Sequence, residues 1–130
     1  MKKLRENYLD GEKLFLKYFE MGEATSIPRL VNYATSENML SPEGKKPTPM
    51  GVWKAMWRWA SLKENKDRAF EVFSHYVKNY GWRFPDTDLP WDSDDPRELW
   101  HQFMMKTIKS AWQFGTQSRL NRFLHKNGWI

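Results

Sequence analysis

Residues 44–61 hold the densest set of side chains with an evident chemical use. Thr48 suits the cap of a helix and Pro49 its first position, so a helix is expected to begin here. At about 100° per residue, one side of that helix carries Val52, Ala55, Met56, Trp59 and Ala60. The opposite side carries Gly51, Lys54, Arg58 and Ser61. Small and basic residues facing outward are typical of a helix that enters a nucleic-acid groove, because glycine lets a phosphate backbone approach closely. An ordinary amphipathic helix with a hydrated polar face fits the same pattern.

The loop before this helix is basic. Lys45 and Lys46 follow Gly44, and Glu43 is the one carboxylate between residues 39 and 48. Two lysines beside a glycine suit a phosphate contact, and Thr48 would join them just before the helix. The alternative interpretation is a hydrated surface loop, which could also contain a short hairpin.

A second basic tract occupies the end of the chain. No acidic residue follows Glu98, whereas five basic residues do: Lys106, Lys109, Arg119, Arg122 and Lys126. The acids are instead concentrated between Asp86 and Asp95. Two basic tracts separated by an acidic segment suggest a molecule that grips a polyanion at two places. It is equally consistent that the acidic segment neutralises the C-terminal helices within the monomer.

The helices that would position these groups follow from apolar spacing. In the first half, residues 8–21 form one helix, interrupted early by Gly11, and a turn at 22–25 leads to a short helix capped by Ser26. The third helix is the one that begins at Thr48. This order resembles the helix-turn-helix DNA-binding domains of recombinases, transcription regulators and small phage terminase subunits. The resemblance covers about residues 8–62 and lies in Phe15-Leu16-x-Tyr18-Phe19-x-x-Gly22, Ser26-Ile27-Pro28-x-Leu30 and Gly51-Val52-Trp53-x-Ala55-Met56.

The resemblance implies a role for the third helix. That helix would lie against the major groove, with Lys54, Arg58 and Ser61 reaching bases or phosphates. Lys45, Lys46 and Thr48 would contact the phosphate backbone just before it. The resemblance is also compatible with a phage or mobile-element protein.

The second half is predicted to be helical as well. Helices are expected over 66–79, with Gly81 as the stop, from Asp95 to about Phe114, and over 117–126. No segment alternates as a half-buried strand does. We therefore predict an all-α fold of about six helices. Residues 1–64 form the helix-turn-helix-like head, and residues 65–130 a helical tail with the acidic loop 82–95 as candidate hinge, together one compact domain.

Composition limits the class of protein. The 130 residues include eight Trp, eight Phe and five Tyr, so large rings should build the core, with some left outside for stacking or protein contact. There is no cysteine, which excludes disulfides and thiolate chemistry and fits the cytoplasm. No apolar run of about 18 residues is present, so no membrane span is expected.

Catalysis is not expected. His75, His101 and His125 are scattered and do not match a metal-ligand spacing. The aspartates of 86–95 lack the glycine and terminal glutamate of a calcium-binding EF-hand loop. The phosphate-binding Gly-Lys-Ser/Thr loop and the Gly-x-Ser-x-Gly elbow are absent from the sequence. We expect no catalytic residue, no metal and no cofactor.

The sequence thus favours a small cytoplasmic protein that binds duplex DNA through a helix-turn-helix. Its C-terminal helices would add phosphate contacts, or mediate self-association through their aromatic faces. The alternative is a non-catalytic helical adaptor subunit that docks exposed tryptophans into a larger protein complex. Steep salt dependence of duplex binding would distinguish the first from the second.

Overall fold

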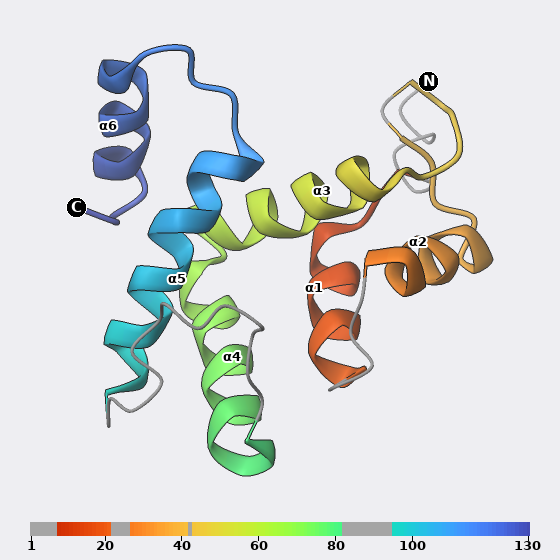
Figure 1. The fold of residues 1–130 in the computed structure, drawn as a ribbon, viewed down its shortest axis with the longest axis horizontal. Coiled ribbons are helices and arrows are strands. Elements are labelled where there is room, and N and C mark those ends of the chain that lie inside the picture. The colour runs from red at the N-terminus through yellow and green to blue at the C-terminus, as the bar shows by residue number, and fades with distance from the viewer. Residues whose placement is uncertain (1–7, 22–26, 42, 82–94) are drawn as a thin grey trace. The chain divides into compact units, whose positions relative to one another are not determined.

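The computed structural model describes residues 8–21, 27–41, 43–81 and 95–130, and every structural statement below concerns these ranges. They form six helices (Figure 1): α1 (Gly11–Glu20), α2 (Ile27–Ser36), α3 (Pro49–Ser61), α4 (Lys66–Tyr80), α5 (Pro96–Ala111) and α6 (Gln117–Lys126). Within these ranges there is no strand, and a single parallel bridge joins Tyr8 to Leu40. The predicted all-α class is confirmed.

The contacts within the chain divide it into two units, residues 1–59 and residues 60–130. The division falls inside α3, before the head–tail boundary predicted at residue 64. Residues 82–94 of the acidic segment named as a candidate hinge lie outside the described ranges, as do the predicted turn at 22–25 and the Ser26 cap.

Aromatic rings build the core of the first unit, as composition predicts. α1 and α2 pack against each other. Phe15 lies edge-on to Trp57, with 5.6 Å between ring centroids, and Tyr18 lies edge-on to the same indole at 5.5 Å. Such edge-to-face pairs place a positive ring edge against a negative ring face. The fully buried side chains of this unit are Leu14, Phe15, Phe19, Leu30, Ala34, Val52, Met56 and Trp57.

The tryptophans of α3 differ in burial. Trp57 is fully buried, whereas Trp53 and Trp59 are half-buried. The spacing placed Trp59 on the apolar side of the helix. Because the rings of α1 surround Trp57, this residue rather than Trp59 is the aromatic anchor of the helix.

Gly11 begins α1 instead of interrupting it. Asp10 caps the helix by accepting a hydrogen bond from the backbone N–H of Lys13 at 3.1 Å. A Cβ at Gly11 would lie 2.5 Å from the Cβ of Trp59 and 2.6 Å from the carbonyl oxygen of Ala55. α1 and α3 therefore approach each other at a point where no side chain fits, which explains the glycine.

In the second unit, α4 and α5 run side by side (Figure 1). Phe73 of α4 and Trp100 of α5 stack at 4.9 Å, and α4 ends at Gly81 in the left-handed conformation (φ 63°), as predicted. α5 starts where predicted, with Asp95 accepting from the N–H of Arg97 at 3.0 Å. It ends at Ala111, however, because Trp112 turns to an extended conformation, so the predicted end near Phe114 was wrong.

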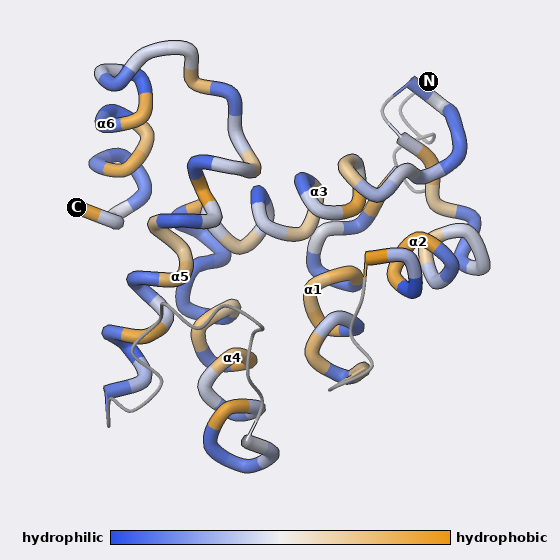
Figure 2. The backbone as a smooth tube through the Cα atoms, in the orientation of Figure 1, coloured by the Kyte–Doolittle hydropathy of each residue, from blue (hydrophilic) through white to orange (hydrophobic). Residues whose placement is uncertain are grey.

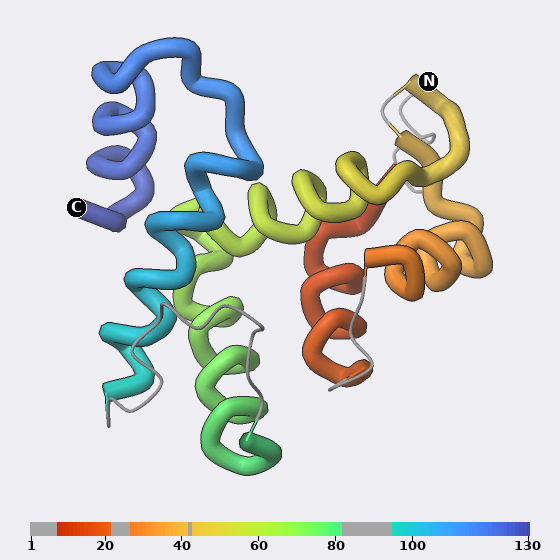
Figure 3. Tube along the Cα trace, in the orientation of Figure 1, coloured from red at the N-terminus to blue at the C-terminus, as the bar shows by residue number. Residues whose placement is uncertain are grey.

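The segment after α5 forms an extended arch that leads to α6 (Figure 3). α6 spans the residues predicted for it and is capped by Thr116, whose hydroxyl accepts from the N–H of Arg119 at 3.3 Å. Leu120 and Leu124 are its buried side chains, and hydrophilic and hydrophobic residues alternate around it (Figure 2). α6 is thus an amphipathic helix with one face left to the solvent.

We expect Gly11→Ala to destabilise the fold by about 1–3 kcal/mol, because the added methyl group overlaps a backbone carbonyl that cannot move aside. Chemical denaturation followed by circular dichroism measures this change. Lys13→Ala, an exposed position on the same helix, is the control and should change stability by less than about 0.5 kcal/mol. Equal stability of the two variants would contradict the close crossing of α1 and α3.

Candidate nucleic-acid interface

The basic loop of the first unit is a defined turn. The N–H of Ser41 donates to the carbonyl of Lys45 at 2.8 Å, and the N–H of Lys45 donates to the hydroxyl of Ser41 at 3.1 Å. Gly44 occupies the turn with φ 80°, and Pro47 is buried beside it. The described residues of 38–48 form no strand, so the short hairpin that this loop could have contained is not seen in them; the N–H of Leu9 donates to the carbonyl of Leu40. The turn fixes the backbone from which the two lysines project.

The loop residues predicted to contact phosphate are accessible. Lys45, Lys46 and Thr48 are all exposed. The hydroxyl of Thr48 accepts from the N–H of Gly51 at 3.0 Å, which confirms Thr48 as the cap of α3. Two ammonium groups therefore stand at the amino end of a helix, where the helix dipole also favours an anion.

The face of α3 that was predicted to point outward is less exposed to solvent than the residue spacing suggested. From Gly51 to Ser61 no residue of the helix is exposed. Lys54 and Arg58 are half-buried, and Arg58 has an interaction within the structure. A Cβ at Gly51 would meet the Thr48 hydroxyl at 3.1 Å and Leu9 at 3.5 Å, so its space is used by the chain itself. Gly51 is half-buried, as Lys54 and Arg58 are.

Ser61 does not face outward at all. It is fully buried and belongs to the second unit. Its hydroxyl accepts a hydrogen bond from the indole N–H of Trp112 at 3.1 Å, and its carbonyl accepts from the indole N–H of Trp129 at 2.9 Å. A buried indole N–H requires an acceptor, and Ser61 supplies two of them. Its predicted contact with nucleic acid was therefore wrong.

The C-terminal residues return to the segment that follows Ser61. The side-chain carbonyl of Asn127 accepts from the N–H of Lys63 at 2.9 Å. Lys66 donates to the carbonyl of Gly128, and its ammonium lies 4.4 Å from the ring centre of Trp129. Burial lowers the pKa of Lys66, while the charge of Asp67 acts in the opposite direction. α6 is thereby fastened at both ends, by Trp112 before it and by residues 127–129 after it.

This anchoring leaves a basic face on α6. Arg119, Arg122 and Lys126 are exposed and recur at a spacing of three and four residues, which places them on one side of the helix. Leu120 and Leu124 occupy the buried side. The exposed charges therefore share a surface on a helix whose position is fixed by its other face.

Lys106 and Lys109, also predicted as phosphate contacts, are exposed residues of α5. Within the described ranges, no carboxylate lies within ion-pair distance of Lys109, Arg119, Arg122 or Lys126. The four aspartates from Asp86 to Asp94 lie outside those ranges, and Asp95 caps α5. The charge of these four basic residues is thus not neutralised by any part of the chain that the structure describes.

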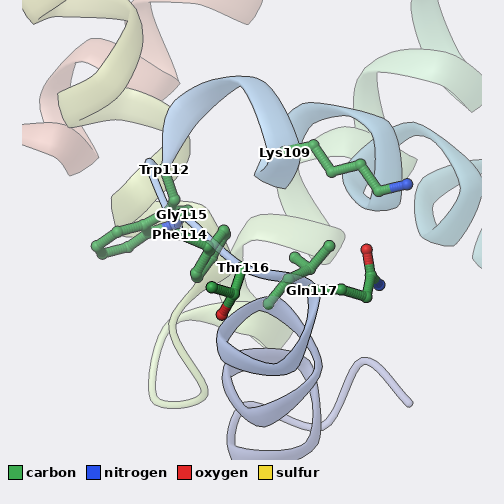
Figure 4. Close-up of a pocket in the computed structure, with 7 residues that line it drawn as sticks. Lys109, Trp112, Phe114, Gly115, Thr116 and Gln117 are labelled. Carbon is green, nitrogen blue, oxygen red and sulfur yellow. The ribbon is translucent and has the colours of Figure 1, made fainter.

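An open groove of about 260 Å³ lies between the end of α5 and the start of α6 (Figure 4). Its lining consists of Lys109, Trp112, Phe114, Gly115, Thr116, Gln117 and Leu120. Trp112, Phe114 and Phe123 are half-buried and form a cluster, with ring centroids 4.9 to 6.2 Å apart. We call this feature the aromatic groove. Its lining thus includes aromatic rings, the cationic side chain of Lys109 and residues at the start of α6.

A second hollow, of about 150 Å³, is lined by Lys66, Asp67, Phe70, Arg97, Trp100, His101 and Trp129. Its cations are already engaged: Lys66 by the carbonyl of Gly128, and Arg97 by the ring of Phe70, 4.6 Å away. This hollow is therefore part of the contact that holds the C-terminal residues in place.

The aromatic groove was not predicted. The apolar spacing assigned Trp112 to the core face of a helix that continued to Phe114, whereas the helix ends before them. The available signal was the Trp-x-Phe-Gly-Thr sequence at 112–116, since Gly115 adopts φ 80° and Thr116 caps the next helix. If the helix had been predicted to end at Trp112, the rings of Trp112 and Phe114 would have been assigned to the loop after α5 and not to its core face.

The exposed tryptophans needed for an adaptor are not found among the six that the structure describes: Trp57, Trp100 and Trp129 are buried, and Trp53, Trp59 and Trp112 half-buried. Trp82 and Trp91 lie outside the described ranges. The large apolar residues that are exposed, Met50, Tyr80 and Ile130, are scattered through the sequence.

The described residues include no cluster of three or more His, Asp or Glu side chains that could hold a metal ion. None of the helices described is both long and apolar enough to cross a bilayer. Comparison with protein families, curated proteins and solved structures gave no match to this chain.

We expect Ser61→Ala to lower the free energy of unfolding by about 1 kcal/mol, since the Trp112 indole loses its acceptor while the Trp129 bond to the backbone carbonyl remains. Hydrogen exchange of the Trp112 indole proton should accelerate, which NMR detects. Ser110→Ala, at an exposed position, should leave that proton unchanged. An unchanged Trp112 indole signal in Ser61→Ala would contradict the role assigned to Ser61.

Proposed function

We propose that this protein binds nucleic acid, with duplex DNA as the preferred form, and that it acts by binding rather than by chemistry. The observation that carries the proposal is the basic face of α6. Arg119, Arg122 and Lys126 share one exposed face, and within the described ranges no carboxylate lies within ion-pair distance of them. An array of unneutralised cations on a fixed helix suits the regularly spaced charges of a phosphate backbone.

The first unit offers a second contact of the same kind. Lys45 and Lys46 project from a hydrogen-bonded turn directly before α3, and Thr48 is exposed beside them. These groups contact phosphates, which position a protein on DNA without reading its sequence. The helix order of this unit supports the proposal of a helix-turn-helix-like head. Lys54 and Arg58, with their side chains half-buried, are its candidates for contacts farther along α3.

The α6 contact is tested by neutralising two arginines. Each lost phosphate contact reduces the slope of log affinity against log salt by roughly 0.9. For Arg119→Gln/Arg122→Gln we therefore expect a slope smaller in magnitude by about 1.8, with weaker binding to every duplex sequence. Fluorescence anisotropy with a labelled duplex at several salt concentrations measures both quantities.

The control is Lys13→Gln/Lys78→Gln, which removes the same charge from exposed positions of α1 and α4. Its slope should match that of the wild type within about 0.5. A slope equally reduced in both double variants would show only a general charge effect. Salt-independent binding of a protein partner in place of DNA would favour the adaptor.

The head contact is tested in the same assay with Lys45→Gln/Lys46→Gln. If both basic tracts contact one duplex, the slope falls by about 1.8 in this variant and by about 3.6 when it is combined with the α6 variant. Binding that depends on α6 alone would leave the loop variant with the wild-type slope. That result would remove the first unit from the interface.

A further inference from the structure

We propose that the aromatic groove holds one unpaired nucleobase, so that the protein prefers DNA in which a single-stranded base adjoins the duplex. This inference rests on the proposed binding of nucleic acid and adds to it a specific structural feature of the ligand. The groove lies in the same unit as the basic face of α6, directly before that helix in the chain.

Its rings are suited to stacking. Phe114 lies 5.3 Å from Phe123 and 6.2 Å from Trp112, measured between ring centroids. Trp112 and Phe114 line the groove, and Phe123 packs against both of them; all three residues are half-buried. Aromatic side chains of this kind stack on any base, because every base has a π face.

The groove is also held in place before any ligand arrives. The indole N–H of Trp112 donates a hydrogen bond to the buried hydroxyl of Ser61. The hydroxyl of Thr116 accepts one from the N–H of Arg119 in the first turn of α6. Gly115 supplies the positive φ of the bend between them, and a Cβ there would meet nothing within 4 Å. Such a fixed surface loses little conformational entropy when a base binds.

Charge indicates that the aromatic ligand carries a phosphate. The side chains of Lys109 and Gln117 lie on one side of the groove, and the ring of Trp112 lies on the other (Figure 4). Lys109 has no carboxylate within ion-pair distance in the described ranges. A base stacked on the rings would thus have its phosphate in a part of the chain that carries Lys109 and the basic face of α6.

The volume of the groove suits one base. Pockets for drug-sized ligands measure roughly 300–1,000 Å³, and this groove, at about 260 Å³, is smaller. A base that remains paired in a duplex is stacked between its neighbours and cannot present its face to a side chain. The base must therefore come from a strand end, a gap or a bulge.

The test compares two labelled DNA molecules of equal charge. Both contain the same duplex with a three-nucleotide single-stranded extension, which carries bases in one molecule and abasic sites in the other. The wild type should bind the base-bearing molecule about 5- to 150-fold more tightly, the range expected from stacking of one base. Phe114→Leu keeps apolar volume but removes the ring, and it should bind both molecules with the same affinity.

Arg119→Gln is the matched control, and it should weaken binding to both molecules by the same factor because it removes a phosphate contact. Equal binding of both molecules by the wild type would overturn the aromatic groove as a base site and leave the proposed function standing. Absence of binding to either molecule would overturn both. Since the wild-type comparison needs no variant, its outcome does not depend on the folding of Phe114→Leu.

Discussion

A single buried serine joins the two segments of chain that flank α6. Ser61 accepts hydrogen bonds from two indoles, one from Trp112 at the end of α5 and one from Trp129 near the C-terminus. Because the two tryptophans flank α6, the serine fixes the chain on both sides of that helix. The basic face and the aromatic groove depend on this arrangement, since an unanchored amphipathic helix of ten residues is only marginally stable in water.

A steric constraint governs the first unit. α1 and α3 meet at Gly11, where a side chain would overlap Trp59 and the carbonyl of Ala55. The close approach and the rings around Trp57 make α3 a core helix, with no exposed residue between Gly51 and Ser61. For DNA binding this matters, because a helix that supplies the core has little surface left for a groove. The exposed lysines lie before α3, in a turn stabilised by its own hydrogen bonds.

Much of the local structure followed from residue types. Thr48, Asp95 and Thr116 cap helices because a hydroxyl or carboxylate can accept from the first turn, and Gly81 ends α4 because it adopts a positive φ. The helix pattern and the all-α class were predictable for that reason. The end of α5 was not, since Ala111, Trp112 and Phe114 continue an apolar helical spacing. The turn brings the indole of Trp112 to the buried hydroxyl of Ser61, 51 residues away in the sequence.

By itself the sequence determined what depends on neighbours along the chain: the helices, the caps Thr48 and Asp95, and a C-terminal region without carboxylates after Glu98. The basic residues on α6 were found in this way, because a helical spacing alone places Arg119, Arg122 and Lys126 together. Tertiary structure decided which polar side chains are accessible to a ligand. Ser61 and Arg58 share a predicted face, yet Ser61 is buried by two indoles that lie 51 and 68 residues away in sequence. Hydrogen bonds between such distant residues leave no periodic signal, so a buried acceptor and a solvent-facing contact look alike until the chain is folded.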